Sequence, residues 1–185
     1  MNNKHTDALL ELLSAVAAKD EEAFRKLYDA THKNIFFYVH RILRDQQTAE
    51  DVVAETYLAV WKGAAGFKGR SKVLTWIFGI ARNLAMNTLK KKKPEYCIDD
   101  FHHLSTDGGL DNPGCDQRDA VARGLLRISI KHREVLDLVF YQGFNYEEIS
   151  AILKVPLNTV KTRVYYAKKA LHDALHKMGV KRDDL

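Results

Sequence analysis

The sequence predicts an all-α protein of two small helical domains joined by a flexible acidic linker. Apolar residues recur at three- and four-residue steps through almost every ordered segment, which is the period of a helix with one buried face. No strand pattern bounded by hairpin turns occurs. Between residues 94 and 114 the period disappears and Gly, Pro, Asp and Ser accumulate, as is typical of a linker. We therefore expect domains at residues 1–93 and 118–185, with the linker at 94–117.

The first domain begins with two expected helices. Residues 7–18 form a short amphipathic segment. Asp20 opens a longer helix that runs to Leu43, and Glu21 and Glu22 follow it in the first turn. Acidic side chains at this end interact favourably with the helix dipole, so the start of the second helix is well defined.

Two further helices complete the first domain. Thr48 and Asp51 have the spacing of a capping box, which predicts a helix from Thr48 to about Ala64. Glycines interrupt the pattern between residues 63 and 69. A fourth helix is then expected from Ser71 to the lysines at 90–93. It should end there because Pro94 disfavours helical geometry at the residue before it.

The second domain is expected to contain helices near 116–128 and 131–142, followed by a helix-turn-helix over Phe144–Leu171. Asn145 can cap the first helix of that motif, and Pro156 ends it. The second helix has a buried stripe, and its opposite face carries polar and basic side chains suited to phosphates and base edges. These outward residues are Thr159, Lys161, Thr162, Tyr165, Lys168 and Lys169. DNA binding is the favoured interpretation, although lysine-rich outer faces also occur on helical hairpins that bind no DNA.

The charge pattern fits a polyanionic partner. The chain has a net charge of +5 and a pI of about 9.1. Residues 1–93 hold 16 Lys and Arg against 10 Asp and Glu, and residues 119–185 hold 12 against 8, whereas 94–118 hold one against 6. Two basic blocks therefore flank an acidic linker, and both are free to contact nucleic acid.

Composition also predicts a soluble cytoplasmic protein. Two cysteines do not make a disulfide scaffold in a chain of 185 residues, so a reducing compartment is expected. No signal peptide is evident, and no apolar run approaches the 18 residues of a membrane span, so we expect no stable membrane insertion.

The third helix carries an acidic stripe with an apolar centre. Asp51, Glu55, Leu58 and Lys62 follow at helical spacing on the side opposite the expected core. Like charges four residues apart cost about 0.2–0.5 kcal/mol, and Leu58 gains nothing from water. This pattern is typical of a protein-binding face, and an ordinary solvated face is the alternative.

The fourth helix carries a row suited to unpaired bases. Trp76, Ile80, Asn83, Asn87 and Lys90 lie opposite its expected core. Rings stack on bases, amides hydrogen-bond their edges, and lysine binds phosphate. The preceding loop adds Phe67, Lys68, Arg70 and Lys72. The alternative is that Trp76 packs into a second layer of helices.

Metal and catalytic sites have little support. Cys97, His102, His103 and Cys115 could in principle bind zinc, but their spacing fits no standard finger. No paired-carboxylate site, nucleophile motif or phosphate-binding glycine loop occurs. We expect no metal, no cofactor and no enzymatic activity.

Together these segments resemble the extracytoplasmic-function sigma factors, the compact class of bacterial RNA polymerase specificity subunits. AEDVVAETYLAVW at 49–61 resembles the region 2 motif that docks on the clamp helices of polymerase. LTWIFGIARNLAMNTL at 74–89 resembles the helix that melts and reads the −10 element. Residues 132–171, from HREVL to KKAL, resemble region 4, which reads the −35 element. Gly79, where the family often has arginine, and Ile128-Ser129-Ile130, in place of Leu-Pro, depart from the pattern.

The resemblance implies a transcription initiation factor with three contact surfaces. Asp51, Val52, Glu55, Leu58 and Lys62 would bind core polymerase. Phe67, Arg70, Lys72, Trp76, Asn83, Asn87 and Lys90 would bind −10 DNA, where a base is flipped from the strand. Asn158, Thr159, Lys161, Thr162, Arg163, Tyr166 and Lys168, within the helix-turn-helix of Tyr146 to Val164, would bind −35 DNA.

The implied partners are core RNA polymerase (the clamp helices of the β′ subunit and the flap of the β subunit), promoter DNA in duplex and single-stranded form, and an anti-sigma factor. The response served would be to stress or to an envelope signal. Two other interpretations stay open: a dimeric helix-turn-helix regulator that binds an operator unaided, and an interaction protein that competes for a regulator without reading DNA.

Overall fold

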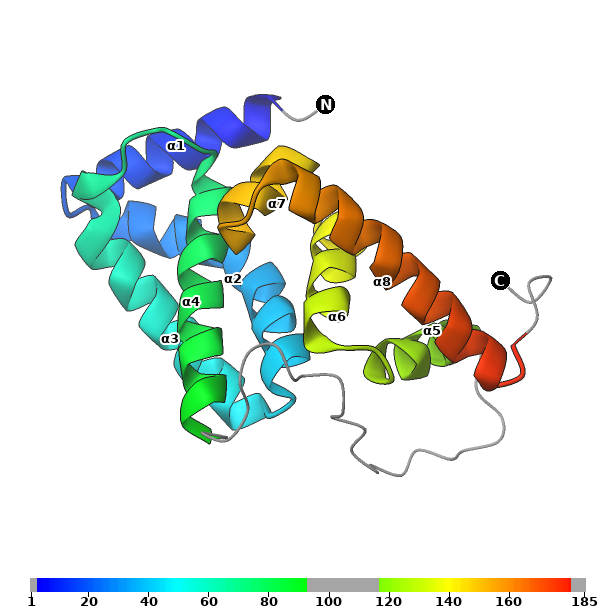
Figure 1. Cartoon of the computed structure of the whole chain (residues 1–185). Coiled ribbons are helices and arrows are strands. Elements are labelled where there is room, and N and C mark those ends of the chain that lie inside the picture. The colour runs from blue at the N-terminus through cyan, green and yellow to red at the C-terminus, as the bar shows by residue number, and fades with distance from the viewer. Residues whose placement is uncertain (1–2, 93–116, 181–185) are drawn as a thin grey trace. The chain divides into compact units, whose positions relative to one another are not determined.

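The computed structural model describes residues 3–92 and 117–180, which fold into helices joined by short turns, with no strand among them (Figure 1). The expected all-α fold class is confirmed. In chain order the elements are α1 (Asn3–Ala17), α2 (Glu21–Leu43), α3 (Gln46–Gly63), η1 (Ala64–Gly66), α4 (Val73–Lys92), α5 (Gln117–Leu126), α6 (Ile130–Leu136), η3 (Asp137–Tyr141), α7 (Tyr146–Leu153) and α8 (Leu157–Lys177).

Contacts between Cα atoms divide the chain into two compact units. The first contains α1 to α4 together with residues 147–155, which include most of α7. The second contains α5, α6, η3 and α8. The expected boundaries at residues 93 and 118 stay a prediction.

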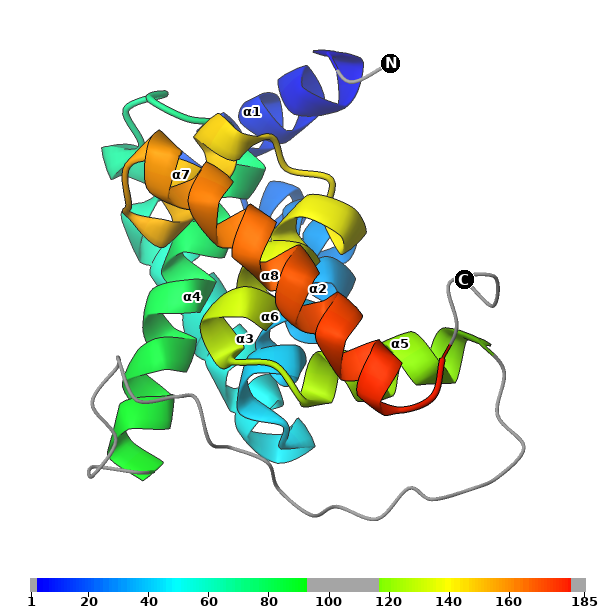
Figure 2. The ribbon, with the colours of Figure 1, turned by 45° about the vertical axis from the view of Figure 1, so that its right-hand side comes forward.

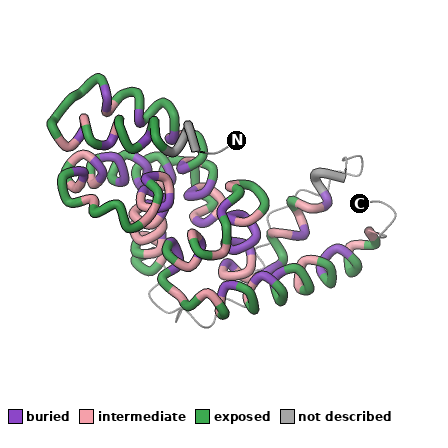
Figure 3. Tube along the Cα trace, turned by 90° about the horizontal axis from the view of Figure 1, so that it is seen from above, coloured by how far each residue is buried: buried purple, intermediate pink, exposed green. Residues whose placement is uncertain are grey.

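The first unit is a helical bundle in which α2 packs against α3 and α4, while α1 lies across the end of the bundle where η1 stands (Figure 1). Buried apolar residues recur along one side of each helix, as the purple segments of Figure 3 show. Inside the bundle, the hydroxyl oxygens of Thr31 and Tyr57 are 2.6 Å apart, and Thr31 also donates to the Leu27 carbonyl. This hydrogen-bonded pair fixes the register of α2 against α3.

The helix starts of the first unit follow their caps. The Asp20 carboxylate accepts from the Ala23 amide at 2.9 Å, as expected for the N-cap of α2. The third helix starts earlier than predicted, because Asp45 rather than Thr48 is its cap. The Asp45 carboxylate accepts from the Thr48 amide at 2.9 Å and from the Thr48 hydroxyl. Thr48 is therefore the residue that donates to the cap. The capping-box spacing between Thr48 and Asp51 placed the N-cap of this helix three residues too late.

In the second unit α6 and α5 pack against α8, and α5 lies beside the C-terminal half of α8 in the turned view (Figure 2). Ser129 caps α6 by accepting from the His132 amide, so this start does not require proline. The buried Arg133 side chain donates to the carbonyls of Leu125 and Ile128, which ties the end of α5 to α6. The helix expected to reach residue 142 changes to a π-helical turn at Asp137–Tyr141.

Candidate nucleic-acid interface

A tight turn precedes α8. Lys154 adopts a left-handed conformation with φ of 55°, which ends α7. The Val155 amide donates to the Ser150 carbonyl at 3.3 Å, and the Ser150 hydroxyl donates back to the Val155 carbonyl at 2.6 Å. Pro156 then starts α8 without a side-chain cap. The first amides of α8 are consequently without a capping side chain, as is favourable for a helix end that approaches phosphate.

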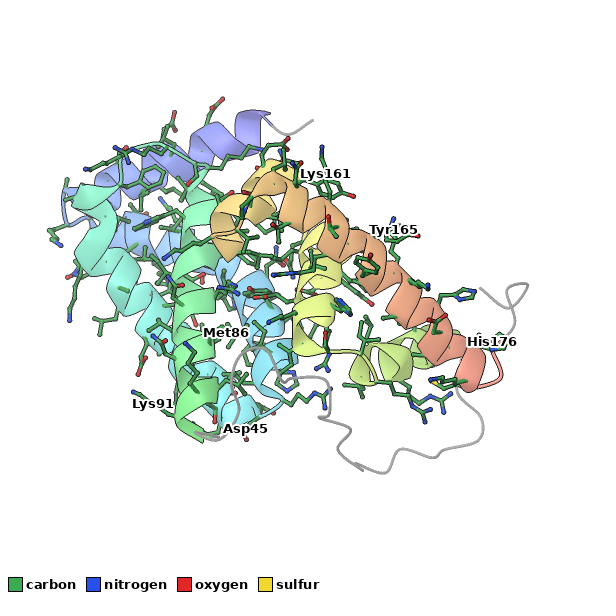
Figure 4. The ribbon with its side chains drawn as sticks, in the orientation of Figure 1. Asp45, Met86, Lys91, Lys161, Tyr165 and His176 are labelled. Atoms are coloured by element: carbon green, nitrogen blue, oxygen red, sulfur yellow. The ribbon has the colours of Figure 1, made fainter. Side chains whose placement is uncertain are left out.

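The outward face of α8 is polar and exposed. Val160, Val164 and Ala167 are at most 3% exposed and form the inner stripe. Asn158, Lys161, Thr162, Tyr165, Tyr166 and Lys169 are exposed on the other side, and Figure 4 labels Lys161 and Tyr165 along this helix. Thr159 and Arg163 are half-buried at one edge of this face. Six side chains of one helix therefore form a continuous surface of suitable chemistry for a DNA groove.

Thr162 has a defined hydrogen-bonding role on this face. Its hydroxyl donates to the Asn158 carbonyl one turn earlier, at 2.9 Å. The proton is thereby engaged, and the oxygen keeps its lone pairs for a donor from outside. Thr162 consequently faces a ligand as an acceptor.

Lys168 belongs to a different environment from Lys161. Its ammonium lies 5.2 Å from the centre of the Phe140 ring, a cation–π contact with η3. It also lines an apolar pocket of about 390 Å³, whose other walls come from α5, the segment from α6 to η3, and α8. Phe140 and Tyr141 at this pocket are 60% and 55% exposed. Sequence reasoning did not identify the pocket, because its lining comes from elements whose packing no spacing reveals.

On α4 the predicted row is present, with Trp76 held at its start. Ile77, Phe78, Ala81 and Ala85 are fully buried on the opposite side. Asn87 and Lys90 are exposed and Ile80 and Asn83 half-buried.

Trp76 itself is half-buried. Its ring centre lies 5.3 Å from that of Phe67, and a methyl group placed on Gly63 would be 3.6 Å from Cζ2 of the indole. Trp76 therefore packs on the preceding loop and keeps part of its ring accessible. The loop also exposes Lys68, Arg70 and Lys72, and Gly69 takes a φ of 67° there.

The predicted stripe on α3 is exposed, with one correction. Asp51, Glu55, Leu58 and Lys62 all face away from the core, and Leu58 is 51% exposed. Val52 was predicted to belong to this surface, but its side chain is only 2% exposed. Val52 lies in the core beside Val53, so it cannot serve as a surface contact of the folded unit.

The described residues contain neither a metal-binding cluster nor a membrane-spanning helix. Within residues 3–92 and 117–180, no cluster of three or more His, Cys, Asp or Glu side chains could hold a metal ion. Cys97, His102, His103 and Cys115 lie outside the described residues. None of the described helices is long and apolar enough to cross a membrane.

Comparisons with known proteins match both halves of the chain. The Sigma-70 region 2 family matches residues 27–95, and the Sigma-70 region 4 family matches residues 118–171. The chain is 27% identical to the ECF RNA polymerase sigma factor SigW of Bacillus subtilis over 176 residues, covering 88% of this chain and 94% of that protein. It is 29% identical to SigK of Mycolicibacterium vanbaalenii, also an ECF RNA polymerase sigma factor, covering 92% and 90% respectively.

Two solved structures share the fold. CnrH, in complex with the cytosolic domain of CnrY, aligns with a TM-score of 0.69 at 19% identity, over 92% of this chain and 98% of that chain. The sigma factor RpoE of Bartonella quintana, in complex with the anti-sigma factor NepR, aligns with a TM-score of 0.64 at 23% identity, over 83% and 96%. The two matched regions follow one another along the chain, and the relatives align over most of its length. The chain therefore belongs to the extracytoplasmic-function sigma factors of RNA polymerase, a family of transcription initiation factors that are not enzymes.

Proposed function

We propose that this chain binds core RNA polymerase through α3, opens and reads the −10 element with α4 and its preceding loop, and reads the −35 element with α8. The observation that carries this proposal is the presence of three exposed faces of different chemistry on three helices. One face is acidic with an apolar centre, one is aromatic and amide-bearing, and one is polar and basic. Polymerase supplies the chemistry of RNA synthesis.

For −35 recognition, α8 enters the major groove by its N-terminal half. Lys161 and the threonines reach base edges and phosphates, and the first amides of the helix favour a phosphate. Tyr166 and Arg163 lie along the backbone of the groove. Lys168, held over Phe140, acts at the edge of this contact.

For −10 recognition, Trp76, Asn83 and Asn87 contact the strand that is displaced on melting. Lys90, Arg70 and Lys72 bind its phosphates, and Phe67 forms part of the pocket that receives a flipped base. Unstacking that base costs a few kcal/mol, which stacking and edge contacts offset.

For polymerase binding, Asp51, Glu55, Leu58 and Lys62 dock on the clamp helices of the β′ subunit. The apolar pocket beside Phe140 and Tyr141 receives the flap of the β subunit, since an exposed apolar patch of this kind is typical of a protein interface. A chain that makes both contacts works with polymerase, and the cytoplasm is its proposed compartment.

An anti-sigma factor is the proposed regulator, in a response to stress or to an envelope signal. Of the two solved structures of the same fold, one was determined with the anti-sigma factor NepR and the other with the cytosolic domain of CnrY. The same exposed faces that bind polymerase and DNA are available to such a partner.

Run-off transcription with purified core polymerase tests the proposal. Promoter-selective transcripts from a genomic template library should appear only when this chain is added. An operator-binding dimer would instead shift duplex DNA without polymerase, and a chain that only competes for a regulator would do neither. Absence of selective transcripts would overturn the proposal.

The α3 assignment has its own test. Asp51→Lys with Glu55→Lys should lower affinity for core polymerase at least tenfold, or about 1.4 kcal/mol. The matched control is Glu11→Lys with Asp29→Lys, which reverses two exposed acids elsewhere in the same unit. Equal affinity of the two double variants would show that α3 is not the docking helix.

A further inference from the structure

The first helix, α1, forms one wall of a hollow beside the loop of residues 67–72, which precedes α4. The hollow has a volume of about 380 Å³ and is lined on α1 by Leu10, Leu13, Ser14 and Ala17. Its opposite wall is formed by Ala64, Ala65, Phe67 and Gly69, in η1 and in the loop that follows it. Residues 3–17 lie outside the segment that the Sigma-70 region 2 family matches, which begins at residue 27. The family match therefore assigns no role to α1.

Phe67 connects this hollow to the reading face of α4. It lines the hollow and also lies 5.3 Å from the ring centre of Trp76. A base that enters the hollow is thus separated from Trp76 by one aromatic ring. The hollow and the α4 face consequently form one continuous surface within the first unit.

The distance between the two walls is held by a clip at the end of α1. Lys19 takes a left-handed conformation with φ of 70°, and its ammonium donates to the Trp61 carbonyl at 3.2 Å. The same ammonium lies 5.0 Å from the centre of the indole of Trp61, which packs edge-on against Phe24. Trp61 is two residues before the end of α3, so Lys19 fixes α1 to the point where the loop begins.

The chemistry of the hollow suits a nucleobase. Leu13 is buried as its floor, Leu10 is 46% exposed at its rim, and Phe67 offers a ring. The Ser14 hydroxyl donates to the Leu10 carbonyl, which leaves its oxygen as an acceptor for a base amino group. Lys68 and Arg70 are exposed on the same loop and supply positive charge for the flanking phosphates, whereas the Lys72 ammonium lies 2.8 Å from the Glu148 carboxylate.

We propose that α1 is a working part of the −10 reader: the hollow between α1 and residues 64–69 takes one unpaired base of the promoter strand, and Leu10 and Ser14 contribute to its selectivity. This rests on the proposed function, because an unpaired promoter base is available only where the chain opens the −10 element. The volume lies within the range of about 300–1,000 Å³ that is usual for small-ligand sites. Bound here, the base is enclosed by α1 on one side and by Phe67 on the other.

The test fills the hollow. Ser14→Phe is compared with Glu11→Phe, which adds the same ring to the same helix at an exposed residue that does not line the hollow. Each full-length variant is combined with core polymerase and a promoter library that carries all four bases at each −10 position. Wild type and Glu11→Phe should prefer one base at one position, and Ser14→Phe should lose that preference at least about fivefold, the effect of one stacked base.

A second variant covers a failure of Ser14→Phe to fold. Leu10→Ala shortens a half-exposed side chain at the rim and should weaken the preference at the same promoter position, while melting curves and core binding stay those of wild type. If both hollow variants keep the full wild-type base preference, the hollow proposal is wrong and the proposed function stands. If wild type itself gives no selective transcript, both fall together.

Discussion

The buried hydroxyl of Tyr57 shows how one residue couples packing to pH in this protein. Burial raises the pKa of Tyr57 well above its usual value of 10, and the hydrogen bond with Thr31 opposes this shift only in part. Below about pH 10 the hydroxyl is protonated in both the folded and the unfolded chain, so its stabilising contribution is complete. Above that pH the unfolded chain ionises first, and the free energy of unfolding falls as pH rises.

The difference in the free energy of unfolding between wild type and Tyr57→Phe should therefore change with pH. At pH 8 the variant should be less stable by about 1 kcal/mol, because it lacks the hydrogen bond to Thr31. At pH 11 wild type should lose about 1.4 kcal/mol relative to the variant, since only wild type has a tyrosine at this position that ionises on unfolding, so the variant should then be at least as stable as wild type. Urea unfolding followed by tryptophan fluorescence measures both values. Tyr165→Phe, at a residue 66% exposed, is the control for the removal of a tyrosine hydroxyl and should leave the stability at pH 8 unchanged.

At the scale of single elements, two helical glycines should respond to alanine with opposite signs. A methyl group on Gly79 in α4 would meet nothing within 4 Å, so the gain in helix propensity should raise the stability of the first unit by about 1 kcal/mol. A methyl group on Gly124 in α5 would lie 2.9 Å from Cδ2 of the buried Leu175 and 3.1 Å from Cδ1 of Leu171. Gly124→Ala should therefore cost the second unit about 1–3 kcal/mol.

Two probes separate these effects. Both tryptophans, Trp61 and Trp76, are in the first unit, so their fluorescence follows that unit, whereas circular dichroism follows both. Gly79→Ala should raise the unfolding midpoint followed by fluorescence. Gly124→Ala should lower the unfolding midpoint of the second unit, which circular dichroism detects, and should leave the fluorescence midpoint unchanged. A fluorescence shift caused by Gly124→Ala would show that the two units unfold together.

The elements also show what sequence reasoning can reach. Helical period located the α-helices of the described residues but not the short 3-10 helix η1, because one buried stripe per α-helix is visible in a single chain. Caps were harder: Asp45 and Thr48 are both good cap residues, and only the hydrogen bonds distinguish the cap from its partner. Val52 was assigned to the exposed stripe because it follows Asp51 directly. Neighbouring residues of a helix point in directions about 100° apart, so Asp51 is exposed while Val52 is buried.

Sites made by several elements were out of reach of the sequence. The hollow beside Phe67 needs α1 to lie across the end of α3, and the Lys19 clip to Trp61 spans 42 residues. The π-helical turn at Asp137–Tyr141 is an irregularity that the spacing of apolar residues in this segment does not predict. Such features depend on tertiary packing, which apolar period does not encode.

At the scale of the whole molecule, two readers on one chain make −35 binding conditional on the −10 contact. Once polymerase and the first domain are anchored, the second samples nearby DNA at a raised effective concentration, so a weak contact becomes useful. Lys161→Ala should then lower run-off transcription from a promoter with an intact −35 element by about fivefold or more, the cost of one base contact. The same variant should leave transcription from a promoter with a scrambled −35 element unchanged.

Lys177→Ala, an exposed lysine in the last turn of α8, is the control for the lost charge and should behave as wild type on both promoters. Inserting about 5 bp between the two elements should reduce the Lys161 effect to nothing, because half a helical turn of DNA carries the −35 major groove to the opposite side. An equal loss with Lys161→Ala on intact and scrambled promoters would contradict this account, and would place Lys161 in folding or in polymerase binding rather than in promoter reading.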